Sequence, residues 1–280
     1  MVNNEVFLQQ MQEGLSEIVK PYQRQLDQQQ KMAELVNLCL RHAGRDDFIA
    51  LDELLKTKKA EAVENEESLK GCKEFFDRLR AYANEKVERY RIQFIEDLRA
   101  RAEEAALPLA VDFPRLSSLK GIEATVDFSQ RTSTINKKTL KSIDPRRIVS
   151  ALLKAKRELY DRPFEAQSFV NGLHQTYKEI LKKENLAPGH AVPVQRFYFE
   201  YVMSLQSKAF LQDMAKGKFR GYSVDQFGVD IWRYFQSATG GTSEGYALQL
   251  RAGRNNSLWL IDSDGEKRQI TGISFQKVKS

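Results

Sequence analysis

The side chains best suited to chemistry in this chain are lysines and arginines, and they concentrate in its second half. The net charge is +6, yet residues 1–128 hold 19 Lys and Arg against 24 Asp and Glu, whereas residues 129–162 hold ten against three. Basic side chains in loops and at helix starts suit contacts with nucleic-acid phosphates, which give affinity without reading the base sequence. The candidate DNA-binding residues are Lys137, Lys138, Lys141, Arg146, Arg147, Lys154, Arg157, Lys216, Lys218, Arg220, Arg251, Arg254, Lys267 and Arg268.

The same distribution of charge has two other interpretations. The basic patches could meet acidic surfaces of other proteins, or the two halves could be solvated surfaces that differ in charge without a partner. The sequence therefore predicts that any polyanion meets the second half of the chain, and it leaves the kind of polyanion open.

An acidic run near the C-terminus superficially resembles the carboxylates of metal-dependent nucleases. It consists of Asp262, Asp264 and Glu266, followed by Lys267. However, Asp264-Gly265 is typical of a hairpin tip, which would leave the carboxylates in solvent, and no second strand carries a convincing E-x-K element. A phosphate-binding G-x-x-x-x-G-K-[ST] motif and a paired nucleophile and base are also absent from the sequence. We therefore expect no enzymatic activity and no cofactor, with a nuclease as the remote alternative.

The cysteines and histidines do not form a metal-binding pattern. Cys39 and Cys72 lie within apolar helical patterns, which fits buried thiols in a reducing compartment. The three histidines are far apart in sequence and are interpreted as surface or cap residues. The first residues lack the features of a signal peptide, and no window of about 18 apolar residues occurs. The sequence predicts a soluble cytoplasmic protein without a membrane span.

Residues 1–107 are predicted to be helical. A helix over 3–43 carries one apolar stripe, and Pro21 within it should kink the helix or separate two helices. A short helix is expected over 46–58. The apolar stripe of the helix over 3–43 is formed by Phe7, Met11, Leu15, Ile18, Tyr22 and Leu26.

A polar stretch over 58–68 fits either a loop or the start of the next helix. That next helix is predicted over about 65–106, and its apolar residues repeat every 11 positions, which favours a nearly straight helix in a bundle or hairpin. A helical region of this length usually packs against another helix. We therefore expect residues 1–107 to form a helical bundle or coiled-coil-like region that binds a protein partner, for which a long coiled-coil ATPase is one candidate.

Residues 108–162 are predicted to be a linker with a basic β-hairpin and a helix. Pro108 and Pro114 end the preceding helix. Residues 122–128 alternate between apolar and polar side chains, as a half-buried strand does, and residues 133–140 could be its partner. Asp144 and Pro145 fit the N-cap and first position of a helix over 145–160.

Residues 163–280 are predicted to fold as three helices followed by a small antiparallel sheet. The helices are expected over 164–184, 193–215 and 223–237, and the strands over 246–250, 257–261 and 267–275. Ser223 and Gln226 fit a capping box at the start of the third helix. A helix-helix-helix-wing order is that of a winged helix, a layout that binds duplex DNA or serves as a protein–protein module.

The third helix is predicted to expose Asp225, Gln226, Asp230 and Arg233. Two carboxylates on that face would repel phosphates in a major groove, which favours nonspecific or wing-led contact over sequence reading.

The sequence thus predicts a mainly α (α+β) protein: a long-helix bundle, a β-hairpin and helix connector, and a winged-helix-like domain. The expected function is that of a non-catalytic, DNA-associated subunit of a multiprotein complex. It would bind DNA nonspecifically through its basic second half, and it would form a hetero- or homo-oligomer. The alternative is a protein–protein scaffold with no nucleic-acid role.

Overall fold

The computed structural model describes residues 2–65 and 72–278, and it confirms a mixed fold of helices and sheets. About 57% of the chain is helical and 16% is in strands, which agrees with the α+β prediction. Contacts divide the chain into two units. One contains Met1–Asp97 with Phe128–Gln130, and the other contains Leu98–Asp127 with Arg131–Ser280. No helix in the described ranges is long and apolar enough to cross a membrane.

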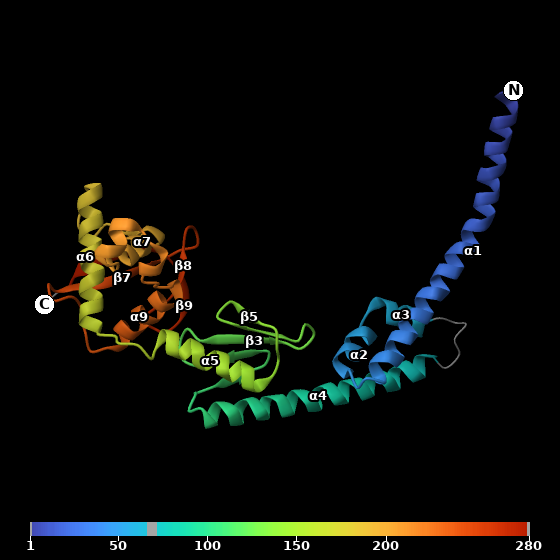
Figure 1. Cartoon of the computed structure of the whole chain (residues 1–280), viewed down its shortest axis with the longest axis horizontal. Coiled ribbons are helices and arrows are strands. Elements are labelled where there is room, and N and C mark those ends of the chain that lie inside the picture. Colours follow the sequence, from blue (N-terminus) through green and yellow to red (C-terminus); the bar gives the residue numbers. More distant parts are fainter. Residues whose placement is uncertain (1, 66–71, 279–280) are drawn as a thin grey trace. The chain divides into compact units, whose positions relative to one another are not determined.

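The first unit is helical, as its patterns of apolar residues predict (Figure 1). It contains α1 (Val2–Ala43), α2 (Phe48–Leu55), α3 (Lys58–Glu64) and most of α4 (Cys72–Glu104). The helix α1 continues through Pro21, so the predicted alternative of two separate helices is wrong. The stretch 58–68 begins as α3, and its residues 66–68, like the predicted helix start before Cys72, lie outside the described residues.

A small core holds the four helices together, and only the last part of α1 contributes to it. Its buried side chains are those of Leu35, Cys39, Leu51, Leu55, Ala60, Val63, Phe76 and Ala83.

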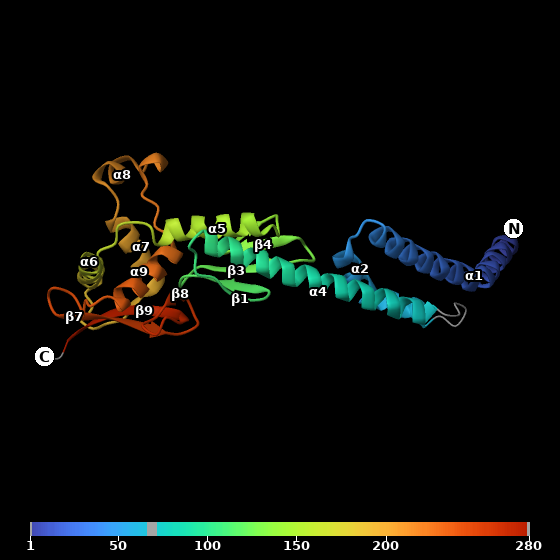
Figure 2. The ribbon, with the colours of Figure 1, turned by 90° about the horizontal axis from the view of Figure 1, so that it is seen from below.

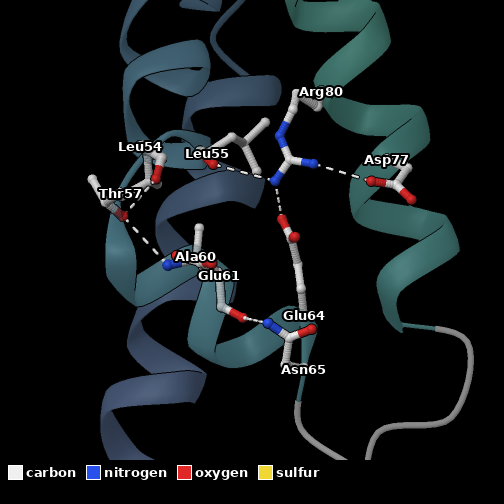
Figure 3. Close-up of polar contacts among 9 residues, drawn as sticks. All are labelled: Leu54, Leu55, Thr57, Ala60, Glu61, Glu64, Asn65, Asp77 and Arg80. Carbon is white, nitrogen blue, oxygen red and sulfur yellow. Dashed lines mark hydrogen bonds and ion pairs between the residues drawn. The ribbon is translucent and has the colours of Figure 1, made fainter.

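Polar contacts at the ends of the short helices fix this core (Figure 3). Thr57 caps α3 by accepting a hydrogen bond from the backbone N–H of Ala60. The guanidinium of Arg80 on α4 donates to the backbone oxygen of Leu55, at the end of α2, and pairs with the carboxylate of Glu64 at the end of α3. A single arginine therefore joins three helices.

After the end of α4, the second unit contains five short antiparallel strands in sequential order. They are β1 (Ala110–Asp112), β2 (Arg115–Ser117), β3 (Glu123–Asp127), β4 (Thr132–Ile135) and β5 (Lys138–Leu140). The hairpin of β3 and β4 lies where alternation predicted it. The single partner strand expected over 133–140 is instead two strands, β4 and β5, because the chain turns between them at Asn136 and Lys137, which both have positive φ angles. The strands β1 and β2 are additions, because segments of three residues are too short to show a periodic pattern.

The helix α5 (Pro145–Leu159) packs against β4 and starts as predicted. Asp144 is its N-cap and accepts a hydrogen bond from the backbone N–H of Arg146 at 2.8 Å, and Pro145 opens the first turn. Its buried face carries Ile148, Val149, Leu152, Ala155 and Leu159.

The rest of the unit is a helical cluster on a small sheet (Figure 2). Its helices are α6 (Ala166–Glu184), α7 (Val194–Ser204), α8 (Lys208–Asp213), the 3-10 helix η1 (Lys216–Lys218) and α9 (Val224–Gln236). Its strands are β6 (Val192–Pro193), β7 (Tyr246–Ala252), β8 (Leu258–Ile261) and β9 (Lys267–Lys277). The strand β9 lies between β6 and β7 and also pairs with β8.

Two local predictions in this cluster need correction. The single helix expected over 193–215 is two helices, because Ser207 caps a new helix by accepting from the backbone N–H of Phe210. His174 is buried and not a surface residue. It lies on the same face of α6 as Tyr177 and stacks on Tyr246, with ring centroids 4.7 Å apart.

Candidate nucleic-acid interface

The strongest cluster of predicted contact residues lies on the outward face of α5. Positions 146, 150, 154 and 157 follow helical spacing and face away from the buried stripe that contains Ile148 and Leu152. The side chains of Arg146, Arg147, Lys154 and Arg157 are all exposed. The packing of the apolar stripe on β4 therefore places a row of cations in solvent.

These four cations have no ionic partner within the described part of the chain. Lys156, on the same helix, differs because its ammonium lies 2.8 Å from a carboxylate oxygen of Asp161. A basic side chain without an internal partner keeps its full charge for an external anion, and it loses no existing ion pair on binding.

The lysines near β5 divide into paired and unpaired residues. The ammonium of Lys137 lies 3.9 Å from Asp225, and that of Lys138 lies 3.3 Å from Glu158. Lys141 forms no ion pair among the described residues. All three side chains are exposed, so this cluster extends the basic surface of α5 but with part of its charge balanced.

A groove of about 590 Å³ lies between β5, α5 and the start of α9. Lys138 and Lys154 are among its lining residues, together with Glu158 and Asp225. Its rim therefore carries both signs of charge, so the groove itself is a weaker anion site than the outer face of α5.

A segment between α7 and α9, called the excursion below, contains α8 and η1 (Figure 2). It carries the predicted residues Lys216, Lys218 and Arg220. Lys218 pairs with Asp213 at 2.5 Å, whereas the other two form no ion pair among the described residues. The side-chain amide of Gln206 binds both backbone groups of Arg220, at 2.8 and 3.0 Å. The excursion is thus tied down at its base and exposes two free cations.

Four further candidates lie around the small sheet, and only two of them are free. Arg251 and Arg254 are exposed at the end of β7 and line an open hollow of about 440 Å³. Lys267 lies 3.2 Å from a carboxylate oxygen of Glu123, and Arg268 lies 2.5 Å from one of Asp262. The last two cations are therefore neutralised within the fold and are poor candidates for phosphate contact.

The acidic run at the tip between β8 and β9 has a structural role. One oxygen of the Asp262 carboxylate accepts backbone hydrogen bonds from Asp264 and Glu266, and the other pairs with Arg268. Both oxygens are thus engaged in closing the turn. Over the described ranges, no group of three or more His, Cys, Asp or Glu side chains is placed to hold a metal ion.

The predicted exposed face of α9 is wrong at one of its key residues. Asp230 is only 2% exposed, and its carboxylate pairs with the guanidinium of Arg162, which follows α5. The same carboxylate accepts a hydrogen bond from the hydroxyl of Tyr222 at 2.6 Å. Helical spacing contained the signal, because position 230 lies on the stripe of Phe227 and Tyr234.

The electrostatics of this buried pair are mutually supporting. Burial raises the pKa of the Tyr222 hydroxyl strongly, and the negative charge of Asp230 raises it further. Burial alone would lower the pKa of Arg162, but the hydrogen bond and charge of Asp230 outweigh burial and leave that pKa raised. Arg162 therefore remains charged at neutral pH and pairs with the buried carboxylate of Asp230.

Further contacts cover the rest of α9. The side-chain amide of Gln226 donates to the backbone oxygen of Glu158 at 3.2 Å. The guanidinium of Arg233 lies 4.4 Å from the ring centroid of Phe164, and Trp232 packs close to the backbone of Gly265. The third helix is thus enclosed by the end of α5, the segment after it and the β8–β9 turn.

The structure brings the predicted residues together in three places and not in one. These are the α5 face with the neighbouring lysines, the segment between α7 and α9, and the turn after β7, while the paired residues Lys267 and Arg268 lie apart at the start of β9. Arg162 was missed because its partner Asp230 lies far along the chain. Tyr222 is only eight residues from Asp230, but it precedes the predicted helix and so lay outside its helical pattern. Searches of protein-family models, curated proteins and solved structures found no match to this chain.

Proposed function

We propose that this protein is a non-catalytic, DNA-associated subunit that binds duplex DNA without sequence preference. The observation that carries the proposal is the row of unpaired, exposed cations on α5, formed by Arg146, Arg147, Lys154 and Arg157. Phosphate contacts of this kind give affinity and orientation but no sequence information. Arg251 and Arg254 would supply a second, smaller contact.

A winged-helix-like arrangement of residues 163–280 supports the proposal. The order α6, β6, α7, α9, β7 and β9, with β9 between β6 and β7, is compatible with that layout once α8 and η1, inserted before α9, and β8, inserted before β9, are set aside. In this chain, however, the third helix is covered, so it cannot enter a major groove as a recognition helix does. Contact through α5 and the turns accounts for affinity without base reading.

We further propose that the helices of residues 1–107 hold a protein partner and that the protein acts in the cytoplasm. The exposed apolar face of α1 supports the first point. The free thiols of Cys39 and Cys72 support a reducing compartment.

A second candidate is an assembly scaffold whose basic face meets an acidic protein surface. The covered helix α9 and the mixed charges of the groove beside it favour this alternative, because neither suits the reading of DNA. Both candidates use the same cations, so only binding measurements separate them.

The test is a filter-binding titration of the full chain against two duplexes of unrelated sequence at several salt concentrations. We expect equal affinity for both duplexes and a linear fall of log affinity with log salt, with a slope of about −0.9 for each phosphate contacted. Absence of binding at low salt, or binding without a salt slope, would exclude the DNA role and leave the scaffold.

A further inference from the structure

The N-terminal half of α1 extends beyond the other helices of its own unit (Figure 1), and it presents a long, exposed apolar stripe. Its large side chains are 51–71% exposed. Further along the same helix, Leu35 and Cys39 are only 3% and 4% exposed. Exposed apolar surface of this extent marks an interaction site in a folded protein. The stripe consists of Phe7, Met11, Leu15, Ile18, Tyr22 and Leu26, widened by Leu8 and Val19.

The spacing of this stripe is symmetric under reversal. Its steps are 4, 4, 3, 4 and 4 residues, so the pattern is the same when the helix is followed in either direction. If two copies of the helix lie antiparallel, each stripe residue meets another stripe residue. The facing pairs are Phe7 with Leu26, Met11 with Tyr22, and Leu15 with Ile18.

We propose that the N-terminal half of α1 pairs antiparallel with the same segment of a second copy of this chain. A two-fold interface requires one surface to be complementary to itself, so that residue i contacts j and j contacts i. The reversible spacing meets this requirement. The inference rests on the proposed role of residues 1–107 in holding a protein partner, and it names that partner as a second copy.

The sides of the stripe also suit self-pairing. On a helical projection they carry uncharged residues, chiefly Gln10, Gln12, Gln23, Gln25 and Gln28, whereas the charged side chains of the segment lie on the opposite face. When a helix pairs antiparallel with its own copy, like flanks meet, and like charges there would repel. Uncharged flanks remove that repulsion.

The length of the stripe is sufficient for a stable contact. Twenty residues of α-helix span about 30 Å. Two such stripes, each half exposed, would bury on the order of 1,200 Å² in total, which reaches the lower part of the range for specific interfaces. Residues 7 and 18, 11 and 22, and 15 and 26 are each 11 apart, a repeat that keeps the stripe on one side of a nearly straight helix.

The first test is sedimentation equilibrium of the full chain without DNA. We expect a dimer. Leu15→Glu or Ile18→Glu, present in both copies, places two carboxylates at the centre of the interface. If each buried charge weakens the affinity at least tenfold, either variant should weaken dimerisation by at least ~100-fold. Gln9→Glu, on the opposite face of the same helix, adds the same charge and should leave the dimer intact. A monomeric wild-type chain would overturn the proposal and assign the stripe to a different protein.

The second test fixes the direction of pairing by disulfide trapping in a Cys72→Ser background. Leu15→Cys should cross-link to its own copy. Met11→Cys and Tyr22→Cys should not cross-link alone, because each lies ~16 Å from its own copy in the antiparallel register, but a mixture of the two should. Cross-linking of Met11→Cys with itself would indicate a parallel pair and contradict the proposal. The background chain, with Cys39 still buried, is the control for non-specific oxidation.

The outcomes remain separate from those of the DNA-binding proposal. Sedimentation uses no DNA, so a dimer that does not bind duplex would contradict only the proposed function. A Leu15→Glu monomer that retains salt-dependent binding would establish that the two properties lie on different parts of the chain.

Discussion

The helices α5 and α9 are both amphipathic, lie in the same unit and differ in what covers their polar faces. In the winged-helix-like layout that we propose, α9 would be the helix that reads DNA, yet contacts from residues 158–164 and from the β8–β9 turn enclose it. The helix α5 packs one face on its sheet and leaves the other, with its unpaired cations, in solvent. Accessibility and free charge, more than position within a fold, thus determine which helix is available to a polyanion.

Removing the carboxylate of Asp230 tests how firmly α9 is enclosed. Asp230→Ala should lower the free energy of unfolding by about 3 kcal/mol, because it leaves the partly buried guanidinium of Arg162 without its partner. Urea denaturation measures this loss. The double variant Asp230→Leu with Arg162→Met should recover much of the stability, since no unpaired charge remains. A loss below about 1 kcal/mol would mean that the pair contributes little to covering α9.

Neutralising the exposed face of α5 tests the other side of the comparison. The triple variant Arg146→Ala, Lys154→Ala and Arg157→Ala should reduce the steepness of the salt dependence of duplex binding by about 2.7, if each cation contacts one phosphate. The readout is the slope of log affinity against log salt.

The matched control removes three cations that are already paired with carboxylates, by replacing Lys120, Lys267 and Arg268 with Ala. It has the same change in net charge, and it should alter the slope much less. Equal effects of the two triple variants would indicate that only net charge matters and that α5 has no special role.

The capping box of α9 offers a smaller and more local test. Ser223 accepts a hydrogen bond from the backbone N–H of Gln226, and the Gln226 side chain binds the backbone N–H of Ser223 in return. Ser223→Ala should cost about 1 kcal/mol of unfolding free energy and leave the salt slope of DNA binding unchanged. Ser207→Ala, the same substitution at the cap of the peripheral helix α8, should cost less. A changed salt slope in the Ser223 variant would place α9 in the interface after all.

Acid should destabilise the second unit through the buried His174 on α6, a helix that packs against α9. Burial lowers the pKa of His174 below 6.5, with Lys178 acting in the same direction and Glu244 against it. At pH values between the folded and the unfolded pKa of His174, the unfolded chain binds more protons than the folded chain. The stability contributed by the neutral imidazole is therefore fully present above the unfolded pKa of about 6.5. It is lost as the pH falls through the lower pKa of the folded state. Thermal unfolding from pH 7 to pH 5 measures the effect. In His174→Phe that dependence should be flatter, and an unchanged profile would show that another group is responsible.

Local signals in the sequence located the helix starts well. Asp144 with Pro145 and Ser223 with Gln226 predict caps because each motif acts within one turn of helix, and the structure has both. The row of cations on α5 was also predictable, since helical spacing alone separates its polar face from Ile148 and Leu152.

What the sequence could not supply was the choice of partners across the chain. The pair of Lys267 with Glu123 joins residues 144 apart, so no local pattern indicates that this lysine is neutralised. The same holds for Arg162 and Asp230, whose pairing converts a predicted exposed carboxylate into a buried one. Short-range interactions determine where each helix starts and which face it buries. Which charged side chains remain unpaired depends instead on which distant segments of the chain meet.

The hydrogen bonds between the side chain of Gln206 and the backbone of Arg220 affect how the sequence of this chain can diverge during evolution. The Gln206 amide joins residue 206 to the backbone of Arg220, and within the enclosed segment Phe210 packs on Phe219 with ring centroids 5.3 Å apart. The ends of the excursion are therefore already closed, and its apolar contacts are largely its own, as in an Ω-loop. Insertions, deletions and substitutions between these ends would leave α7 and α9 in place. In evolutionary terms, we expect residues 207–219 to tolerate divergence, so relatives of the chain should differ there in length and sequence.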